Sequence, residues 1–235
     1  MDLSTTTALV TGANRGFGRA LAAELVSRGA RVYAGARRPE SVDLPGVTPI
    51  ALDVTDPASI AAAVAATGDV TLLVNNAGID TRSNLRTADL ADLADLQAEL
   101  DTHYLGSLSV VRGFLPQVER AGGTIVNVLS ALSWVSFPGT GAYCAAKSAA
   151  WSMTNALRAE LAPRGVTVTG LHVGYMDTDM TVDVEAPKSD PAVIARITVD
   201  AIEAGAPEIV ADEVSRQVRA GLSGGVAALY PQLVG

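Results

Sequence analysis

Residues 6–29, with the sequence TTALVTGANRGFGRALAAELVSRG, decide the fold. Thr6–Val10 is a short run that favours a strand, and Arg19–Arg28 carries a helical pattern that ends at Gly29. The segment between them holds three glycines within seven residues. A glycine-rich loop that joins a strand to a helix is typical of phosphate binding, with a plain strand-to-helix turn as the alternative.

Each glycine of this loop has its own predicted role. Gly12 permits a tight turn, Gly16 lets the backbone approach a pyrophosphate, and Gly18 lets the helix pack closely on the strand. The free N–H groups and the positive dipole end at the start of the helix then attract phosphate oxygens. The spacing is G-x-x-x-G-x-G, which differs from the common G-x-G-x-x-G.

Ser130, Tyr143 and Lys147 form a second informative pattern. If Ala142–Leu161 is helical, Tyr143 and Lys147 share one face at i, i+4. An ammonium beside a phenol lowers the phenol pKa from about 10, which gives an acid/base that acts near neutral pH. Ser130 follows the apolar run Thr124–Leu129, so its hydroxyl is placed to meet the tyrosine over one substrate oxygen. A surface helix with an ordinary Tyr and Lys is the alternative.

Strand-like and helix-like segments alternate along the chain, which predicts a parallel sheet covered on both faces. The predicted strands are Thr6–Val10, Ala30–Ala36, Val47–Leu52, Val70–Val74, Thr124–Leu129, Val166–Leu171 and Glu208–Val210. The predicted helices are Gly18–Ser27, Pro57–Ala66, Thr87–Glu119 with a break near Asp101, Ala142–Leu161 and Pro191–Ala204. We expect an α/β fold of the Rossmann type, a doubly wound parallel sheet of about seven strands in three α/β/α layers. No composition shift divides the chain, so a single domain over residues 1–235 is expected.

Four motifs, in this order, resemble the classical branch of the short-chain dehydrogenase/reductase family over essentially the whole chain. They are Thr11-Gly12-x-x-x-Gly16-x-Gly18, Asn75-Asn76-Ala77-Gly78, Ser130 with Tyr143-x-x-x-Lys147, and Val173-Gly174 to Thr178. The resemblance implies NAD(P)(H)-dependent interconversion of a carbonyl and an alcohol. It also implies that Ser130, Tyr143 and Lys147 are catalytic, and we expect a homodimer or homotetramer.

Composition and charge limit the other functions of the chain. Hydrophobic residues make up 49% of the sequence, enough for a large core, and no apolar run is long enough to cross a bilayer. The net charge is −8, which argues against nucleic acid or an anionic membrane surface as a partner. The single cysteine, Cys144, excludes an internal disulfide and is expected to be a small packed hydrophobe. With no basic and apolar leader at the start, these features favour the cytoplasm. No metal site is predicted.

Charge near the second strand predicts the cofactor. NAD-binding folds place an acidic residue after that strand for the ribose 2′-hydroxyl, but Ala36 stands there, followed by Arg37 and Arg38. Arg15 lies in the glycine loop. Guanidinium groups suit a 2′-phosphate, so NADP(H) is favoured over NAD(H). Solvated loop arginines are the alternative.

The resemblance assigns further cofactor contacts. Asp53 and Val54 border the adenine, and Asn76-Ala77-Gly78 form a floor under the ribose. Met176 and Thr178 hold the nicotinamide carboxamide; the family usually has a proline where Val173 stands, so this turn is expected to be less rigid. The predicted cofactor contacts are Gly12, Asn14, Arg15, Gly16, Phe17, Gly18, Arg37, Asp53, Val54, Asn76, Ala77, Gly78, Tyr143, Lys147, Gly174, Met176 and Thr178.

His103 departs from the family pattern. The family commonly has a catalytic asparagine in an Asn-x-x-Gly pattern, where this chain has His103-Tyr104-Leu105-Gly106. The asparagine is thought to hold a water that relays protons to the lysine. A histidine also accepts and donates protons near neutrality, so His103 is a fourth catalytic candidate. A purely structural helix histidine is the alternative.

The expected substrate is a small, hydrophobic carbonyl compound or alcohol. The apolar residues that suggest its pocket are Leu132, Trp134, Val135, Phe137, Tyr175, Met176 and Met180. Thr181–Pro191 is expected to be a mobile lid. Two other functions remain open: a catalytically weak NADP-binding sensor or protein-interaction module on the same fold, and an extended-branch epimerase or dehydratase. The second needs a larger C-terminal substrate region than the chain offers after Thr178.

Overall fold

The centre of the molecule is a parallel sheet of seven strands in the order β3-β2-β1-β4-β5-β6-β7. The computed structural model describes residues 1–83, 85–86 and 93–233. The strands are β1 (Thr7–Thr11), β2 (Arg31–Ala36), β3 (Val47–Ala51), β4 (Leu72–Asn75), β5 (Thr124–Val128), β6 (Thr167–His172) and β7 (Glu208–Val210). All seven predicted strands are confirmed, with ends displaced by one or two residues.

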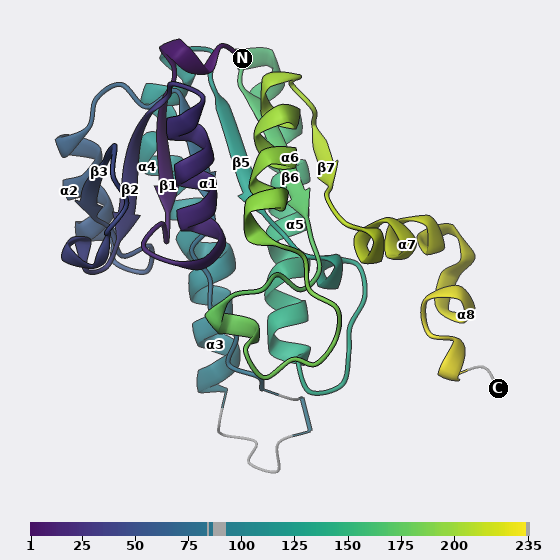
Figure 1. The fold of residues 1–235 in the computed structure, drawn as a ribbon. Coiled ribbons are helices and arrows are strands. Elements are labelled where there is room, and N and C mark those ends of the chain that lie inside the picture. The colour runs from purple at the N-terminus through teal and green to yellow at the C-terminus, as the bar shows by residue number, and fades with distance from the viewer. Residues whose placement is uncertain (84, 87–92, 234–235) are drawn as a thin grey trace.

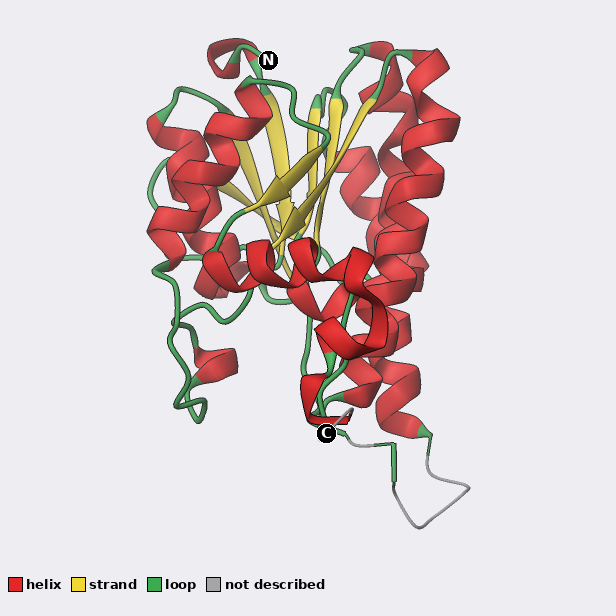
Figure 2. Cartoon of the chain, turned by 90° about the vertical axis from the view of Figure 1, so that its right-hand side faces the viewer, coloured by secondary structure: helices red, strands yellow, loops and turns green. Residues whose placement is uncertain are grey.

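Helices cover both faces of the sheet, which gives the three predicted layers (Figures 1 and 2). The helices are α1 (Gly16–Ser27), α2 (Pro57–Ala66), α3 (Ala94–Leu100), α4 (Ser107–Arg120), α5 (Gly141–Leu161), α6 (Pro191–Glu203), α7 (Glu213–Gly221) and α8 (Gly225–Leu229). Asp56 is the N-cap of α2, where its Oδ1 accepts from the Ala58 N–H. Among the described residues, no helix is long and apolar enough to span a bilayer.

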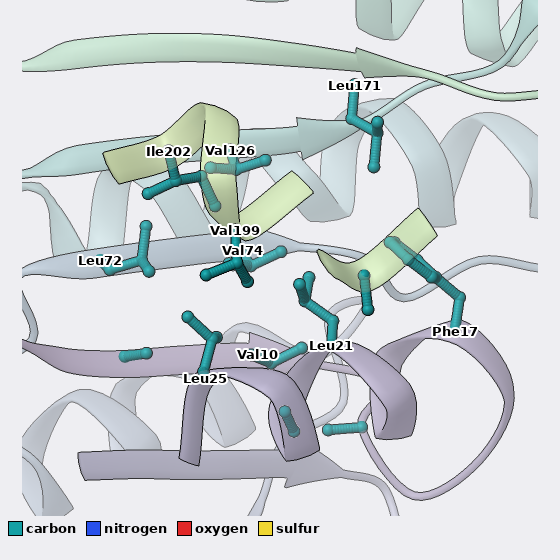
Figure 3. Packing of buried hydrophobic residues seen from close by; sticks show 14 of the residues in the cluster. Val10, Phe17, Leu21, Leu25, Leu72, Val74, Val126, Leu171, Val199 and Ile202 are labelled. Atoms are coloured by element: carbon teal, nitrogen blue, oxygen red, sulfur yellow. The ribbon is translucent and has the colours of Figure 1, made fainter. Parts of the chain in front are cut away.

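Alternating side chains of the strands divide the core into two clusters, one on each face of the sheet. Val10 and Val74 point toward α1 and α6, where Leu21 and Val199 pack on them (Figure 3). The neighbouring Leu9 and Leu73 point to the other face, which α2, α4 and α5 cover. Because both faces are buried, the strands are near-continuous apolar runs. Each fully buried side chain of this size contributes about 1.5–3 kcal/mol.

The long helix predicted over Thr87–Glu119 differs in the structure. Residues 87–92 lie outside the described residues. The rest comprises α3, a π-helical turn over Asp101–Gly106 and then α4, so the irregularity predicted near Asp101 is present. The π turn admits one extra residue per turn and changes the direction of the side chains that follow it. The sequence analysis missed α7 and α8.

The strand order reverses between β1 and β4, because the chain builds outward from β1 on one side and from β4 on the other. In such sheets the carboxyl ends of the strands flank a crevice at the point of reversal. The loops after β1, β4, β5 and β6 all leave from this end of the sheet, so the fold gathers four predicted motifs there.

Candidate active site

A cavity of about 800 Å³ lies at the crevice, within the usual range of roughly 300–1,000 Å³ for small-molecule sites. Every catalytic or cofactor contact predicted from the sequence lines it. These residues are Gly12, Asn14, Arg15, Gly16, Phe17, Gly18, Arg37, Asp53, Val54, Asn76, Ala77, Gly78, His103, Ser130, Tyr143, Lys147, Gly174, Met176 and Thr178. The fold therefore brings the whole predicted set together, while the role of each residue remains a prediction.

The glycine loop fits closely against the loop after β4. A Cβ on Gly18 would overlap the Gly12 carbonyl oxygen, and one on Gly12 would lie 2.9 Å from Ala77 Cα. The Asn76 amide donates to the carbonyl oxygens of Thr11 at 2.8 Å and Gly12 at 3.2 Å. Gly12 and Gly16 have positive φ angles, which favour glycine. The loop thus leaves a backbone-lined cradle at the N-terminus of α1, which suits a phosphate group.

Three arginines and two carboxylates surround the outer end of the cavity; they are Arg15, Arg37, Arg38, Asp53 and Asp179. Arg15 pairs with Asp179 at 3.2 Å, and both side chains are largely exposed. Arg37 and Asp53 lie on the cavity wall close enough to interact. Burial alone raises the pKa of Asp53, but hydrogen bonds from Thr55 and the charge of Arg37 outweigh it and hold that pKa below its usual value. The arginines outnumber the carboxylates by one here, so this end of the cavity carries a small positive charge in a protein whose net charge is −8.

Ser130, Tyr143 and Lys147 meet at the inner end of the cavity. The helix predicted for Tyr143 and Lys147 is α5, so the i, i+4 relation is confirmed. Lys147 Nζ donates to the Val128 carbonyl oxygen at 2.8 Å and lies 5.5 Å from the Tyr143 ring centroid. Burial lowers the pKa of Lys147 to about 8.

The expected fall in the pKa of Tyr143 is not found. Burial raises the pKa of Tyr143 well above its ordinary value; the hydrogen bond with Ser130 lowers it only in part, and the acids Asp80 and Glu99 raise it further. The physical reason is that a phenolate loses more solvation in this buried position than its neighbours restore. At neutral pH Tyr143 is therefore a protonated phenol that can donate.

His103 lies in the π-helical turn and is buried beside these residues. Its ring meets the Tyr143 ring edge to face at a centroid distance of 5.3 Å. Nε2 lies 2.8 Å from the Ile79 carbonyl oxygen and 3.2 Å from Glu99 Oε2. Burial lowers the pKa of His103, as does the charge of Lys147, so the imidazole is neutral at physiological pH. A Cβ at position 78 would lie 2.5 Å from His103 Cε1. The glycine that ends the Asn-Asn-Ala-Gly motif therefore leaves the space that the imidazole ring occupies.

The turn after β6 is held by a residue that the sequence analysis did not single out. The Gly174 N–H donates to Asp212 Oδ2 at 2.6 Å, and Asp212 Oδ1 caps α7 by accepting from the Ser215 N–H at 2.8 Å. This anchor restrains the turn in which Val173 replaces the usual proline.

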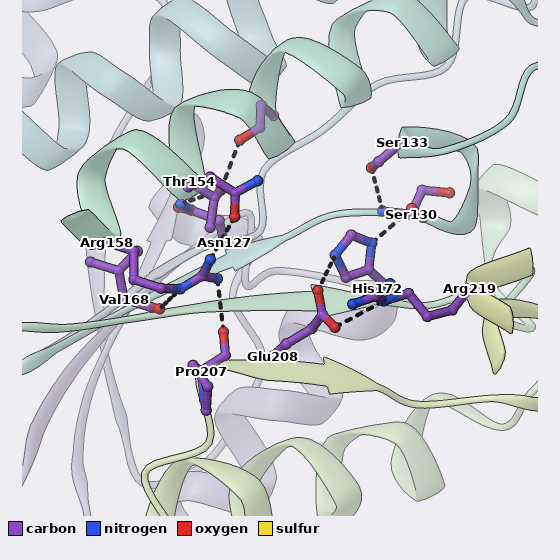
Figure 4. Close-up of polar contacts among 12 residues, drawn as sticks. Asn127, Ser130, Ser133, Thr154, Arg158, Val168, His172, Pro207, Glu208 and Arg219 are labelled. Carbon is purple, nitrogen blue, oxygen red and sulfur yellow. Dashed lines mark hydrogen bonds and ion pairs between the residues drawn. The ribbon is translucent and has the colours of Figure 1, made fainter. Parts of the chain in front are cut away.

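A polar and aromatic cluster supports Ser130 from behind. His172 Nδ1 lies 3.2 Å from the Ser130 carbonyl oxygen, and the Trp134 ring stacks on the His172 ring with centroids 3.7 Å apart. Arg219 of α7 lies over the Trp134 ring. The same arginine pairs with Glu208 at 3.1 Å (Figure 4). The prediction that Trp134 lines the substrate pocket is wrong, because this stacking holds it outside the cavity wall.

The substrate end of the cavity is largely apolar. Of the residues predicted there, those on its wall are Leu132, Val135, Phe137, Tyr175, Met176 and Met180. Helix α7 adds Val214 and Val218, which the sequence analysis missed although their i, i+4 spacing is the signal of an amphipathic helix. Cys144 packs with Leu132 and Val135, as predicted for a small hydrophobe.

The segment predicted as a lid begins beside this wall. Ser189 exchanges backbone hydrogen bonds with Tyr175 and Asp177, so the segment folds back on the turn after β6. Arg82 pairs with Asp183 at 3.2 Å. Mobility of Thr181–Pro191 stays a prediction.

Known proteins match this fold and sequence. Residues 6–189 match the model of the short chain dehydrogenase family. The 3-oxoacyl-(acyl-carrier-protein) reductase FabG of Vibrio harveyi is 36% identical over 226 residues, which cover 91% of this chain and 90% of that protein. The gluconate 5-dehydrogenase of Gluconobacter oxydans is 34% identical, covering 77% of this chain and 75% of that protein. The crystal structure of a short chain dehydrogenase from Burkholderia cenocepacia in complex with NADP is 36% identical, with a TM-score of 0.93 and 100% coverage of both chains.

Proposed function

The chain belongs to the short-chain dehydrogenase family, and we propose that it is an NADP(H)-dependent oxidoreductase that interconverts a carbonyl and an alcohol on a small, apolar substrate. The observation that carries the proposal is the shared cavity. Its inner end holds Ser130, Tyr143 and Lys147, and its outer end holds the glycine cradle with Arg15 and Arg37.

The residues on the cavity wall fit a dinucleotide. The glycine cradle suits the pyrophosphate, Asp53 and Val54 suit the adenine, and Met176 and Thr178 suit the carboxamide. Bound NADP(H) would supply or take up the hydride. Ala36 stands where NAD-binding folds have an acidic residue, and Arg37 follows it. This arrangement supports NADP(H) over NAD(H). The Burkholderia cenocepacia protein, 36% identical, binds NADP in its crystal structure, which supports the same choice.

The inner residues divide the acid chemistry between them. The hydroxyl groups of Ser130 and Tyr143 are placed to donate hydrogen bonds to one carbonyl oxygen, which polarises the carbonyl carbon. Tyr143 then gives its proton to that oxygen, and its raised pKa keeps the proton available at neutral pH. Lys147 places a positive charge beside the phenolate that forms. A protonated Tyr143 favours the direction of carbonyl reduction.

The remaining assignments are part of the same proposal. We propose one catalytic domain over residues 1–235, a homodimer or homotetramer, and a cytoplasmic location. The exposed Leu105 and the groove between α4 and α5, whose lining includes Leu108, Met153 and Leu157, support self-association through these helices. Neither nucleic acid nor membrane is proposed as a partner.

A substrate panel tests the function. NADPH oxidation is measured with apolar ketones and aldehydes of graded size, and binding of NADPH is measured separately by titration. Turnover of at least one compound is expected. Tight NADPH binding with no turnover over the whole panel would favour the alternative, an NADP-binding sensor or interaction module.

A further inference from the structure

Glu99 is a buried acid that the proposed mechanism does not use. Its side chain is 0% exposed, and it lies on α3 one turn before His103. Oε1 accepts from the Thr81 N–H at 2.7 Å and from the Thr81 hydroxyl at 3.1 Å. Within the described part of the chain, Oε2 has no hydrogen-bond partner, although it lies 3.2 Å from His103 Nε2. A buried carboxylate oxygen without a donor is costly, so its position needs an explanation.

The contacts of His103 decide its tautomer. The Ile79 carbonyl oxygen, 2.8 Å from Nε2, can only accept, which favours a proton on Nε2. The nearby Oε2 of Glu99 also favours a proton on Nε2. The Ile79 N–H approaches Nε2 at 3.3 Å and would favour the other tautomer, but that contact is longer. The other tautomer would also set the Nε2 lone pair against a carbonyl oxygen and a carboxylate.

The charge of the same carboxylate also acts on the buried lysine. Lys147 has no ion pair in the part of the chain that the structure describes, and its ammonium donates to the Val128 carbonyl oxygen. A buried ammonium without a counter-charge is unstable. The groups that face this region are Glu99 from α3, Tyr143 and Lys147 from α5, His103 from the π turn and Asp80 from the loop after β4. Glu99 raises the pKa values of Tyr143, Lys147 and His103 alike, although burial is the larger effect at each.

We propose that Glu99 is a positioning residue: it fixes His103 as the Nε2–H tautomer, leaves Nδ1 as the proton acceptor of a ring that lines the cavity, and balances the charge of Lys147. Within the described residues Nδ1 has no hydrogen bond. The catalytic meaning of this arrangement rests on the proposed function, but the tautomer does not.

Imidazole nitrogen NMR tests the tautomer without any turnover. The chain has two histidines, so the spectrum holds two imidazole patterns. His103 should be the Nε2–H tautomer, and His172 should be the Nδ1–H tautomer because its Nδ1 faces the Ser130 carbonyl oxygen. Glu99→Gln places an amide donor near Nε2 and should move His103 toward Nδ1–H. An Nδ1–H pattern for His103 in the unaltered protein would overturn the proposal, whether or not the variant folds.

The pH profile tests the charge. Glu99→Gln should move the alkaline limb of carbonyl reduction to lower pH by about one pH unit, because Lys147 loses a stabilising charge. Asp95→Asn, an exposed acid one turn earlier on α3, is the matched control and should leave the limb in place. A limb that stays in place in both variants would contradict the charge role. If neither the parent protein nor the variants reduce any carbonyl compound, the proposed function fails. The NMR result still decides the role of Glu99 in that case.

Discussion

Tyr143 is the residue on which the proposed chemistry depends. Tyr143→Phe removes the hydroxyl and keeps the ring that packs against His103. We expect turnover to fall by at least ~10²-fold, the usual contribution of general acid catalysis, while NADPH affinity stays within about twofold. Steady-state rates and a fluorescence titration measure the two effects. Substantial turnover in the variant would mean that the proton comes from another group.

Arg37 is the residue expected to select the cofactor. Arg37→Asp places a carboxylate where a 2′-phosphate is expected, so preference should move from NADPH toward NADH by at least ~10-fold through like-charge repulsion. Dissociation constants for both cofactors measure the change. Arg120→Asp makes the same charge change at the exposed end of α4, away from the cavity, and should leave the preference unaltered. Equal affinity of the parent protein for both cofactors would contradict the assignment.

Lys147 gives the reaction a defined alkaline limit. Its pKa is lowered to about 8 by burial, so the ammonium is charged below this pH and neutral above it. The rate of carbonyl reduction should therefore fall as pH rises through about 8, since the positive charge beside the forming phenolate is lost. The pH dependence of kcat/KM measures this. A rate that stays constant to pH 10 would show that the charge of Lys147 is not needed.

The sequence could predict that Ser130, Tyr143 and Lys147 meet in one site, because the residue types and the i, i+4 spacing indicate it. It could not predict the raised pKa of Tyr143, which depends on how much of the phenol the fold buries. Nor did it single out Glu99: the i, i+4 spacing places this acid beside His103, but its hydrogen bonds come from Thr81, in the loop after β4 that the fold brings to α3.

At the scale of elements, His172 links β6 to the loop after β5 and makes that link sensitive to acid. Burial lowers the pKa of His172 to about 4, whereas the unfolded chain binds the proton below about 6.5. The stability that neutral His172 contributes is therefore present above pH 6.5 and is lost as pH falls toward about 4. The loss is on the order of 3 kcal/mol.

His172→Gln keeps a hydrogen-bond donor near the Ser130 carbonyl oxygen and removes the titration. The free energy of unfolding of the variant should depend less on pH between 6.5 and 4 than that of the parent protein. Urea unfolding at several pH values measures the difference between the two proteins, in which the other titrating groups cancel. Parallel curves over this range would mean that His172 is not the acid-sensitive link.

Elements with buried faces were the ones that the sequence could predict. The central strands β1, β4, β5 and β6 are largely buried, and α5 has a long helical pattern, so hydrophobic patterning identified them. The π-helical turn over Asp101–Gly106 was visible only as a break, because one extra residue per turn leaves little trace in a hydrophobic pattern. Helix α7 was missed because it is short and mostly exposed, with Val214 49% exposed on the cavity rim.

At the scale of the whole molecule, one cavity collects residues from position 12 to position 218. The strand order explains this, because β1, β4, β5 and β6 are neighbours in the sheet and the loops after them leave from the same end. Alternating strands and helices predicted the layers, but the order of the strands in the sheet was not predicted, because it depends on contacts between segments far apart in the chain. The last two helices extend from the sheet beyond β7, and α7 closes one side of the apolar end (Figure 1).

Transfer of deuterium from NADPH labelled on its nicotinamide carbon tests the central claim most directly. The protein is incubated with each face-labelled form of the cofactor and with an apolar ketone from the panel, and the alcohol is analysed by mass spectrometry. We predict one deuterium on the carbinol carbon from one labelled face only, because the cavity fixes the cofactor in one orientation, and no labelled alcohol with Tyr143→Phe over the same period. Alcohol formed without deuterium from either face, or no alcohol from any compound of the panel, would contradict the account.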